Sequence, residues 1–128
     1  MKHGNQPRTL DVGQCDADHR NIRGLLSGAF DAVVDRSRSL DEAVEAVQRG
    51  AYDLVLVNRI LDADGTEGIE LIRRLQADPA TRDTPVMLVS NFSEAQKSAL
   101  DAGAKPGFGK DALDSPATIE LLASHLGR

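Results

Sequence analysis

The sequence has few aromatic residues and one cysteine, and these shortages limit the kind of core and the cross-links that the chain can form. Only 3% of its 128 residues are aromatic and none is tryptophan, so a folded core must be largely aliphatic. The lone Cys15 excludes a disulfide within the chain, which is typical of the reducing cytoplasm. No run approaches the roughly 20 apolar residues of a membrane helix, and residues 1–8 lack the apolar centre of a signal peptide. These absences predict a cytoplasmic protein with no membrane segment.

The chain also lacks an excess of basic residues. It carries 15 Lys and Arg against 20 Asp and Glu, which gives a net charge of −5. Binding along a nucleic-acid backbone requires clustered Lys and Arg, so we expect no nucleic-acid partner. The length suits one domain, and no repeat or linker divides the sequence. We expect a disordered tail over residues 1–8 and a single domain over residues 9–128.

What the sequence does contain is two almost unbroken apolar runs. The first, residues 52–58, ends on Asn58 and predicts a buried central strand. The second, residues 85–90, predicts another strand buried on both faces, and shorter runs predict three more. The five strands are expected at residues 9–12, 32–34, 52–58, 85–90 and 107–109.

Helical signals alternate with these strands. Ser39 and Ser93 each stand three residues before a Glu or Gln, the spacing of a capping box, and Ser115 precedes a proline suited to the first helical position. Asp16 and Asp18 are expected as a cap and a first-turn acid. Helices are expected over about 18–28 and between residues 39 and 50, 68 and 78, 93 and 103, and 115 and 126. The alternation predicts an α/β doubly wound, five-stranded parallel sheet with helices on both faces.

Four segments follow one another in a distinctive order. They are residues 52–58, residues 67–72, residues 85–90, and residues 102–104 followed by Lys110. In this order and spacing they resemble the third strand, the next helix start, the fourth strand and the approach to the lysine in receiver domains of bacterial response regulators. The resemblance covers about residues 9–126 and implies a flavodoxin-like (CheY-like) fold.

The resemblance implies a phosphorylation site at the carboxyl ends of the strands. Active members accept a phosphoryl group on a carboxylate of the third strand, and an acidic pair after the first strand holds Mg²⁺. Here the acceptor position is Asn58, whose neutral amide cannot form a stable acyl phosphate. The acidic pair falls on Gln14 and Cys15, and Asp16 matches a third position. A register shifted by one residue would place Asp16 in the pocket and restore a single carboxylate.

Other parts of the family site are retained. Ser90 and Lys110 match the hydroxyl and the lysine that contact phosphoryl oxygens, although Asp111 stands where the family usually has proline. We expect Lys110 to pair with Asp16 or to hydrogen-bond Asn58. Because the nucleophile and the metal ligands are lost together, the resemblance implies a degenerate receiver, or pseudo-receiver, with no catalytic residue, no enzymatic activity and no Mg²⁺ site.

The function expected from this resemblance is protein binding. A stand-alone, non-phosphorylatable pseudo-receiver would act in two-component, phosphorelay-type signal transduction by binding a kinase or effector, or by forming a homodimer. The family's usual output face corresponds to residues 93–126. Phe92 and Phe108 are expected to be interaction anchors on or beside that face.

Two alternatives stay open from the sequence. The vacated pocket at Gln14, Asn58 and Ser90 could bind a small molecule or an anion, with Lys110 supplying charge. The chain could also be an atypical receiver that is still phosphorylated, or binds metal, through Asp16.

The other reactive side chains predict no further site. The three histidines are scattered along the chain and are expected to be exposed, and Cys15 is expected to be an ordinary buried thiol. The histidines are His3, His19 and His125.

Overall fold

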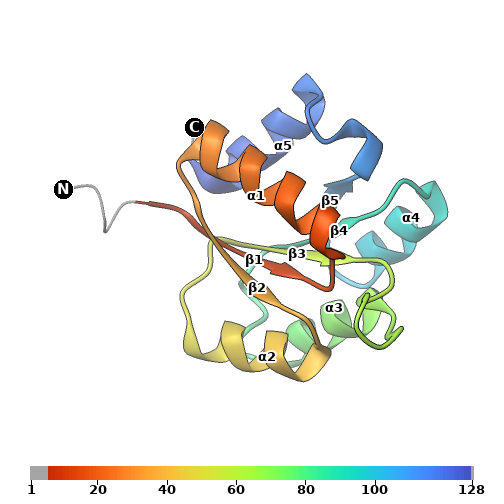
Figure 1. Ribbon diagram of the computed structural model, residues 1–128. Coiled ribbons are helices and arrows are strands. Elements are labelled where there is room, and N and C mark those ends of the chain that lie inside the picture. The colour runs from red at the N-terminus through yellow and green to blue at the C-terminus, as the bar shows by residue number, and fades with distance from the viewer. Residues whose placement is uncertain (1–5, 128) are drawn as a thin grey trace.

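A five-stranded parallel sheet organises the protein, whose computed structural model describes residues 6–127 (Figure 1). The strand order is β2-β1-β3-β4-β5, and each neighbouring pair is parallel. The predicted doubly wound, flavodoxin-like sheet is therefore confirmed. The strands are β1 (Arg8–Val12), β2 (Val33–Ser37), β3 (Leu54–Asn58), β4 (Val86–Val89) and β5 (Lys105–Phe108).

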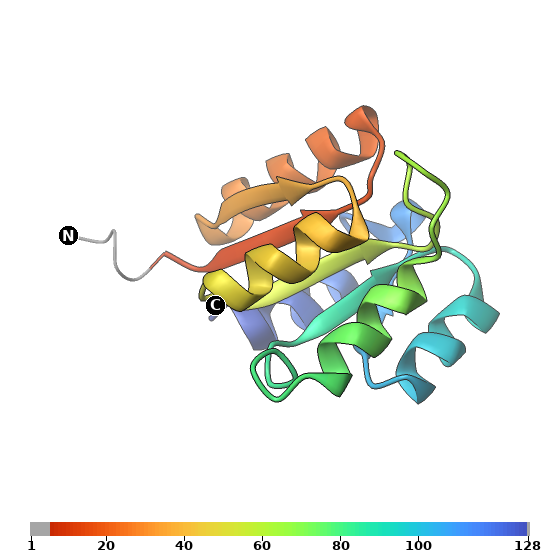
Figure 2. The ribbon, with the colours of Figure 1, turned by 90° about the horizontal axis from the view of Figure 1, so that it is seen from below.

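Helices cover both faces of the sheet. α1 and α5 lie on one face, α2 and α3 lie on the other, and α4 lies beside α3 (Figure 2). A short 3₁₀ helix, η2 (Lys110–Ala112), follows β5. The α-helices are α1 (Asp16–Phe30), α2 (Leu40–Arg49), α3 (Gly68–Ala77), α4 (Ser93–Asp101) and α5 (Pro116–Leu126).

The two central strands contribute to both halves of the core. Leu54 and Leu56 of β3 pack with α1 and α5, whereas Val55 and Val57 pack with α2 and α3. Side chains alternate across a strand, so a strand buried on both faces must be apolar at every position. This requirement explains why residues 52–58 and 85–90 could be identified from the sequence.

The strand boundaries differ from the predicted ones where strands meet solvent or a polar neighbour. β2 extends to Ser37 because it is an edge strand and tolerates Asp35 and Arg36, which concealed it in the sequence. β3 begins at Leu54, and the preceding Tyr52 donates its hydroxyl hydrogen bond to Asp35 at 2.6 Å. The polar half of an edge strand has no apolar pattern that would reveal it.

Two of the three predicted serine caps are confirmed, whereas the cap predicted at Asp16 is wrong, because Asp16 is already helical and Cys15 occupies the cap position. The Ser39 and Ser115 hydroxyl oxygens accept backbone N–H groups three residues later. The capping box predicted at Ser93 is wrong, because Ser93 is already helical and Phe92 occupies the cap position. Gln96 instead reaches back to the sheet, where its Nε2 donates to the carbonyls of Leu88, Ser90 and Phe108 at 2.9, 3.1 and 3.3 Å.

The amino-terminal residues lie partly beyond the described region. Of the tail predicted over residues 1–8, residues 1–5 fall outside the described residues, and Arg8 already belongs to β1. Within residues 6–127, every helix is too short or too polar to cross a lipid bilayer.

Candidate functional site

The carboxyl ends of the strands bring most of the predicted site residues together. A cavity of about 240 Å³ opens beside Asn58 at the end of β3, Ser90 after β4 and Lys110 after β5. Gln14, which follows β1, is buried nearby but does not line this cavity. The other lining residues are Arg59, Ile60, Val89, Asn91 and Phe92.

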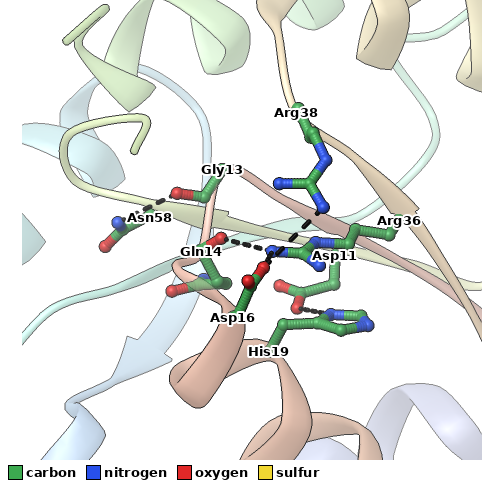
Figure 3. A network of polar contacts seen from close by, with 8 residues as sticks. All are labelled: Asp11, Gly13, Gln14, Asp16, His19, Arg36, Arg38 and Asn58. Atoms are coloured by element: carbon green, nitrogen blue, oxygen red, sulfur yellow. Dashed lines mark hydrogen bonds and ion pairs between the residues drawn. The ribbon is translucent and has the colours of Figure 1, made fainter. Parts of the chain in front are cut away.

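Asn58 is held by both ends of its amide. Its Nδ2 donates to the carbonyl oxygens of Gly13 at 3.1 Å and Ile60 at 2.7 Å, and its Oδ1 accepts the backbone N–H of Arg59 at 3.0 Å. Gly68 packs so closely on the Asn58 carbonyl that any Cβ would clash with it. The amide thus ties the loop after β1 to the loop after β3, as Figure 3 shows for Asn58 and Gly13.

The three positions after β1 point in different directions. Gln14 is buried, and Cys15 is half-buried at the position before α1. Asp16 has a side chain that is 74% exposed, and it pairs with Arg36 at 2.8 Å and Arg38 at 3.7 Å (Figure 3). The Arg36 hydrogen bond lowers the pKa of Asp16. The shifted register that would place Asp16 in the pocket is therefore wrong, since Asp16 faces the arginines at the end of β2.

Lys110 finds a carboxylate that the sequence did not single out. Its Nζ lies 2.8 Å from Oδ2 of Asp18, so the expected pairing with Asp16 is wrong. The hydrogen bond from Lys110 lowers the pKa of Asp18. Asp18 lies in the first turn of α1, and the sequence identified it only as a first-turn acid. Its role depends on how α1 is rotated on the sheet, which no local pattern predicts.

Ser90 has a structural partner in the same loop. It is buried, and its Oγ accepts the backbone N–H of Phe92 at 3.1 Å. Asn91 accepts the backbone N–H of Asp111 at 3.0 Å, which joins the loop after β4 to the segment after β5. These contacts fix the wall of the cavity opposite Asn58.

The two predicted aromatic anchors have opposite environments. Phe92 is 58% exposed, and the guanidinium of Arg59 stacks on its ring at 4.9 Å from the centroid. Phe108 is only 5% exposed and packs in the core under α5. Phe108 is therefore a core residue, and its prediction as an interaction anchor is wrong.

A buried carboxylate in β1 was missed. Asp11 is fully buried, and its Oδ2 lies 2.6 Å from Nδ1 of His19 (Figure 3). His19 was expected to be exposed, but only 14% of its side chain reaches solvent. The signal in the sequence was Asp11 itself, which stands between the apolar Leu10 and Val12. His125 is partly buried, and His3 lies outside the described residues.

The residues at this sheet edge do not fit a Mg²⁺ ion. Magnesium prefers carboxylate oxygens in octahedral geometry, whereas Asn58 and Gln14 present amides. Both nearby acids of α1 are engaged by cations: Asp16 by Arg36 and Asp18 by Lys110. Among residues 6–127, no three His, Cys, Asp or Glu side chains are grouped to hold a metal.

Comparisons with known proteins agree with the geometry of the fold. The family described as response regulator receiver domain matches residues 16–120. A candidate response regulator from Chloroflexus aurantiacus J-10-fl is similar, with a TM-score of 0.84, 22% identity, and coverage of 96% of this chain and 99% of that chain. The chemotaxis response regulator CheY4 of Vibrio cholerae superposes with a TM-score of 0.74 at 16% identity, over 94% of this chain and 99% of that one.

A third solved structure carries a metal ion. It is the receiver domain of the sensor histidine kinase PA1611 from Pseudomonas aeruginosa PAO1, with a magnesium ion coordinated in its active-site cleft. It matches with a TM-score of 0.73 at 18% identity, over 96% of this chain and 99% of that chain. At such low identities these structures show a shared fold. No curated protein matches the chain.

Proposed function

The chain belongs to the response regulator receiver domain family, and we propose that within two-component signalling it is a pseudo-receiver, which binds partner proteins without itself being phosphorylated. The observation that carries this proposal is the position and hydrogen bonding of the Asn58 amide. Its amide occupies the carboxyl end of the central strand, and its nitrogen is used by two backbone carbonyls.

Asn58 is unsuited to accept a phosphoryl group. Covalent catalysis by a side chain at this position requires a carboxylate oxygen as nucleophile. The amide oxygen of Asn58 is a much weaker nucleophile, and it already accepts the N–H of Arg59. The amide therefore supports a structural role in joining two loops.

The surroundings of Asn58 also favour a non-phosphorylatable domain. Phosphoryl transfer relies on cations that neutralise the charge developing on the phosphoryl oxygens. Lys110, which lines the cavity together with Arg59, is paired with Asp18. The donor set does not suit Mg²⁺, so we expect the domain to function without it.

A domain of this kind acts by contact with other proteins, and not as an enzyme. Phe92 is the large apolar side chain most exposed among the described residues. It lies beside the cavity with Arg59 stacked on it, at the start of α4. We propose this aromatic–guanidinium pair as part of the surface that contacts a kinase, an effector or a second copy of the chain.

Acetyl phosphate tests the proposal directly. The protein is incubated with acetyl phosphate and Mg²⁺, and its intact mass is measured beside a phosphorylatable receiver domain treated in the same way. We expect the control to gain a phosphoryl group and this chain to keep its mass. An adduct on this chain, located by fragmentation to any residue of the cavity, would overturn the proposal.

A second candidate function is anion or small-molecule sensing in the same cavity. The volume of about 240 Å³ beside Ser90 and Lys110 is the observation that favours it. Titration with inorganic phosphate, followed by the amide signals of Ser90 and Lys110, tests this candidate. Saturable shifts confined to these residues would support sensing, whereas unchanged signals would leave protein binding as the function.

A further inference from the structure

Asp11 occupies a position where a carboxylate is rarely found. It is the fourth of the five residues of β1, lies on the face of the sheet covered by α1, and is fully buried. Its register partner on the central strand β3 is Leu56, an apolar residue. Charged side chains are almost never buried to this extent unless they are paired, because burial removes the water that solvates the charge.

The partner of Asp11 is His19 on α1. The 2.6 Å contact joins Nδ1 of the imidazole to Oδ2 of the carboxylate (Figure 3). The other carboxylate oxygen, Oδ1, is buried without a hydrogen-bond partner in the described part of the chain. The same holds for both amide atoms of Gln14, whose side chain neighbours this carboxylate. One unpartnered oxygen of Asp11 thus lies near the unpartnered amide of Gln14 in the described part of the chain.

One more charge faces this cluster, from the edge strand β2. Arg36 is the register partner of Asp11, and its Nη2 donates to the Gln14 carbonyl at 3.0 Å and to Asp16 at 2.8 Å. The cluster therefore contains one carboxylate, one imidazole and one guanidinium. Burial raises the pKa of Asp11 to about 6, although the hydrogen bond from His19 opposes the change.

We propose that the Asp11–His19 pair is a proton-responsive contact, and that its protonation repositions the Gly13–Gln14 segment beside Asn58. Acidification would then be an input to this domain that needs no phosphoryl group. The inference goes beyond the proposed function and stands without it, since it involves neither phosphorylation nor a partner.

The chemistry of the step follows from the unpartnered atoms. Above the transition, the Asp11 carboxylate accepts the Nδ1–H of the His19 imidazole. One proton taken from water, by way of the more exposed His19, adds one positive charge to the pair. When that proton resides on Oδ1 of Asp11, the oxygen becomes a donor, and the Oε1 of Gln14 is an acceptor in need of one. A charged Asp11 carboxylate instead attracts the Nε2–H of Gln14, which lowers the Asp11 pKa, so protonation of Asp11 favours a Gln14 amide turned to present Oε1.

The backbone connects this event to Asn58. The carbonyl of Gly13, directly before Gln14, accepts the Asn58 Nδ2 at 3.1 Å and the N–H of Asp62 at 2.9 Å. The N–H of Gly13 donates to Ser37 at 2.9 Å. A shift of the Gln14 side chain thus acts on a segment that already bridges β1, β2 and the loop after β3.

Nuclear magnetic resonance of the full chain across the neutral-to-acid range tests the proposal. We expect the Asp11 side-chain carboxyl carbon to titrate with a midpoint near 6, well above its ordinary value of 3.8. The Gln14 and Asn58 side-chain amides should shift with the same midpoint. In Asp11→Asn, the transitions at Gln14 and Asn58 should disappear. The proposal is overturned if Asp11 titrates near 3.8, or if Asn58 does not respond.

Two histidine variants keep the test decisive if Asp11→Asn folds poorly. In His19→Gln the imidazole that lowers the Asp11 pKa is gone, so the Asp11 midpoint should move upward. A midpoint that stays in place would contradict the pairing. His125→Gln is the matched control, because His125 lies on α5 and is not among the groups that perturb Asp11. It should leave both transitions unchanged.

Discussion

Asp18 holds the ammonium group of Lys110 at a distance of 2.8 Å. A lysine that would contact phosphoryl oxygens in an active relative therefore has a carboxylate of its own chain as partner. Both side chains are about one-third exposed, so the pair contributes little to stability, on the order of 1 kcal/mol or less. The pair instead affects anion binding, because a lysine that is already paired with a carboxylate attracts a second anion more weakly.

Replacing Asp18 should expose that competition. In Asp18→Asn the ammonium group of Lys110 loses its counter-ion, so inorganic phosphate should bind more tightly near Ser90 than it does to the wild type. The measurement is a phosphate titration followed by the amide signals of Ser90 and Lys110. Asp16→Asn is the control, because Asp16 pairs with Arg36 and should leave phosphate affinity unchanged. Equal affinities in wild type and Asp18→Asn would contradict this role for Asp18.

The buried Asp11 should make part of the stability depend on pH. Its folded-state pKa of about 6 lies above the ordinary 3.8, so the folded chain binds this proton more tightly than the unfolded chain. The stabilisation is therefore fully present below about pH 4 and is lost as the pH rises through 6, by roughly 3 kcal/mol in total. Asp11→Asn removes this term.

Denaturant unfolding at several pH values separates Asp11 from the other acids. The free energy of unfolding of Asp11→Asn, relative to wild type, should increase from pH 4 to pH 7. Several exposed acids, including Asp16 and Asp78, have lowered pKa values and lose stabilisation on acidification instead. Their effect is common to both proteins and cancels in the difference. A difference independent of pH would show that Asp11 is not protonated in this range.

The fold could be predicted where both faces of a strand are buried. Residues 54–57 and 86–89 are entirely buried, and a strand buried on both faces can be recognised by its unbroken apolar run. The boundaries of β2 and β5 could not be predicted in the same way. An edge strand is defined by pairing with one distant neighbour, and polar residues such as Asp35 or Arg36 satisfy that pairing as well as apolar ones.

The sequence predicts which residues follow each strand, but not which side chains contact one another in the site. Asn58, Ser90 and Lys110 meet because the carboxyl ends of parallel strands share one edge of the sheet. The partner of Lys110 is set by the rotation of α1, which brings Asp18 and not Asp16 to the segment after β5. The environment of His19 likewise depends on which face of α1 meets β1. These contacts depend on how the elements pack against one another, and the local sequence does not determine that packing.

The two phenylalanines near the site offer a direct contrast between surface and core. Phe92→Ala removes an exposed ring, so the free energy of unfolding should change by less than about 0.5 kcal/mol. Phe108→Ala leaves a cavity under α5 and should lower it by about 3–5 kcal/mol. Thermal or urea unfolding of the two variants measures both effects. If Phe92 is part of the contact surface, its replacement should weaken partner or self-association while the fold stays intact, and unchanged association would exclude that role.

Asn58→Asp tests whether the amide is required by the structure. The substitution replaces a nitrogen that donates to the Gly13 and Ile60 carbonyls with an oxygen that can only accept. Two carbonyl oxygens then lose their donor and face a negative charge, so the free energy of unfolding should fall by about 2 kcal/mol or more at neutral pH.

Asn91→Asp is a matched control for Asn58→Asp in the same wall of the cavity. Asn91 uses its oxygen, which accepts the N–H of Asp111 at 3.0 Å, and a carboxylate oxygen can accept the same bond. This variant should therefore stay within about 0.5 kcal/mol of wild type.

The stability of Asn58→Asp is also measured with added Mg²⁺. With Asp16 and Asp18 engaged by Arg36 and Lys110, the introduced carboxylate has no second acid to complete a metal site. The lost stability should therefore persist in Mg²⁺. Recovery in Mg²⁺ would mean that one substitution rebuilds the metal site, and it would contradict the conclusion that these residues do not suit the ion.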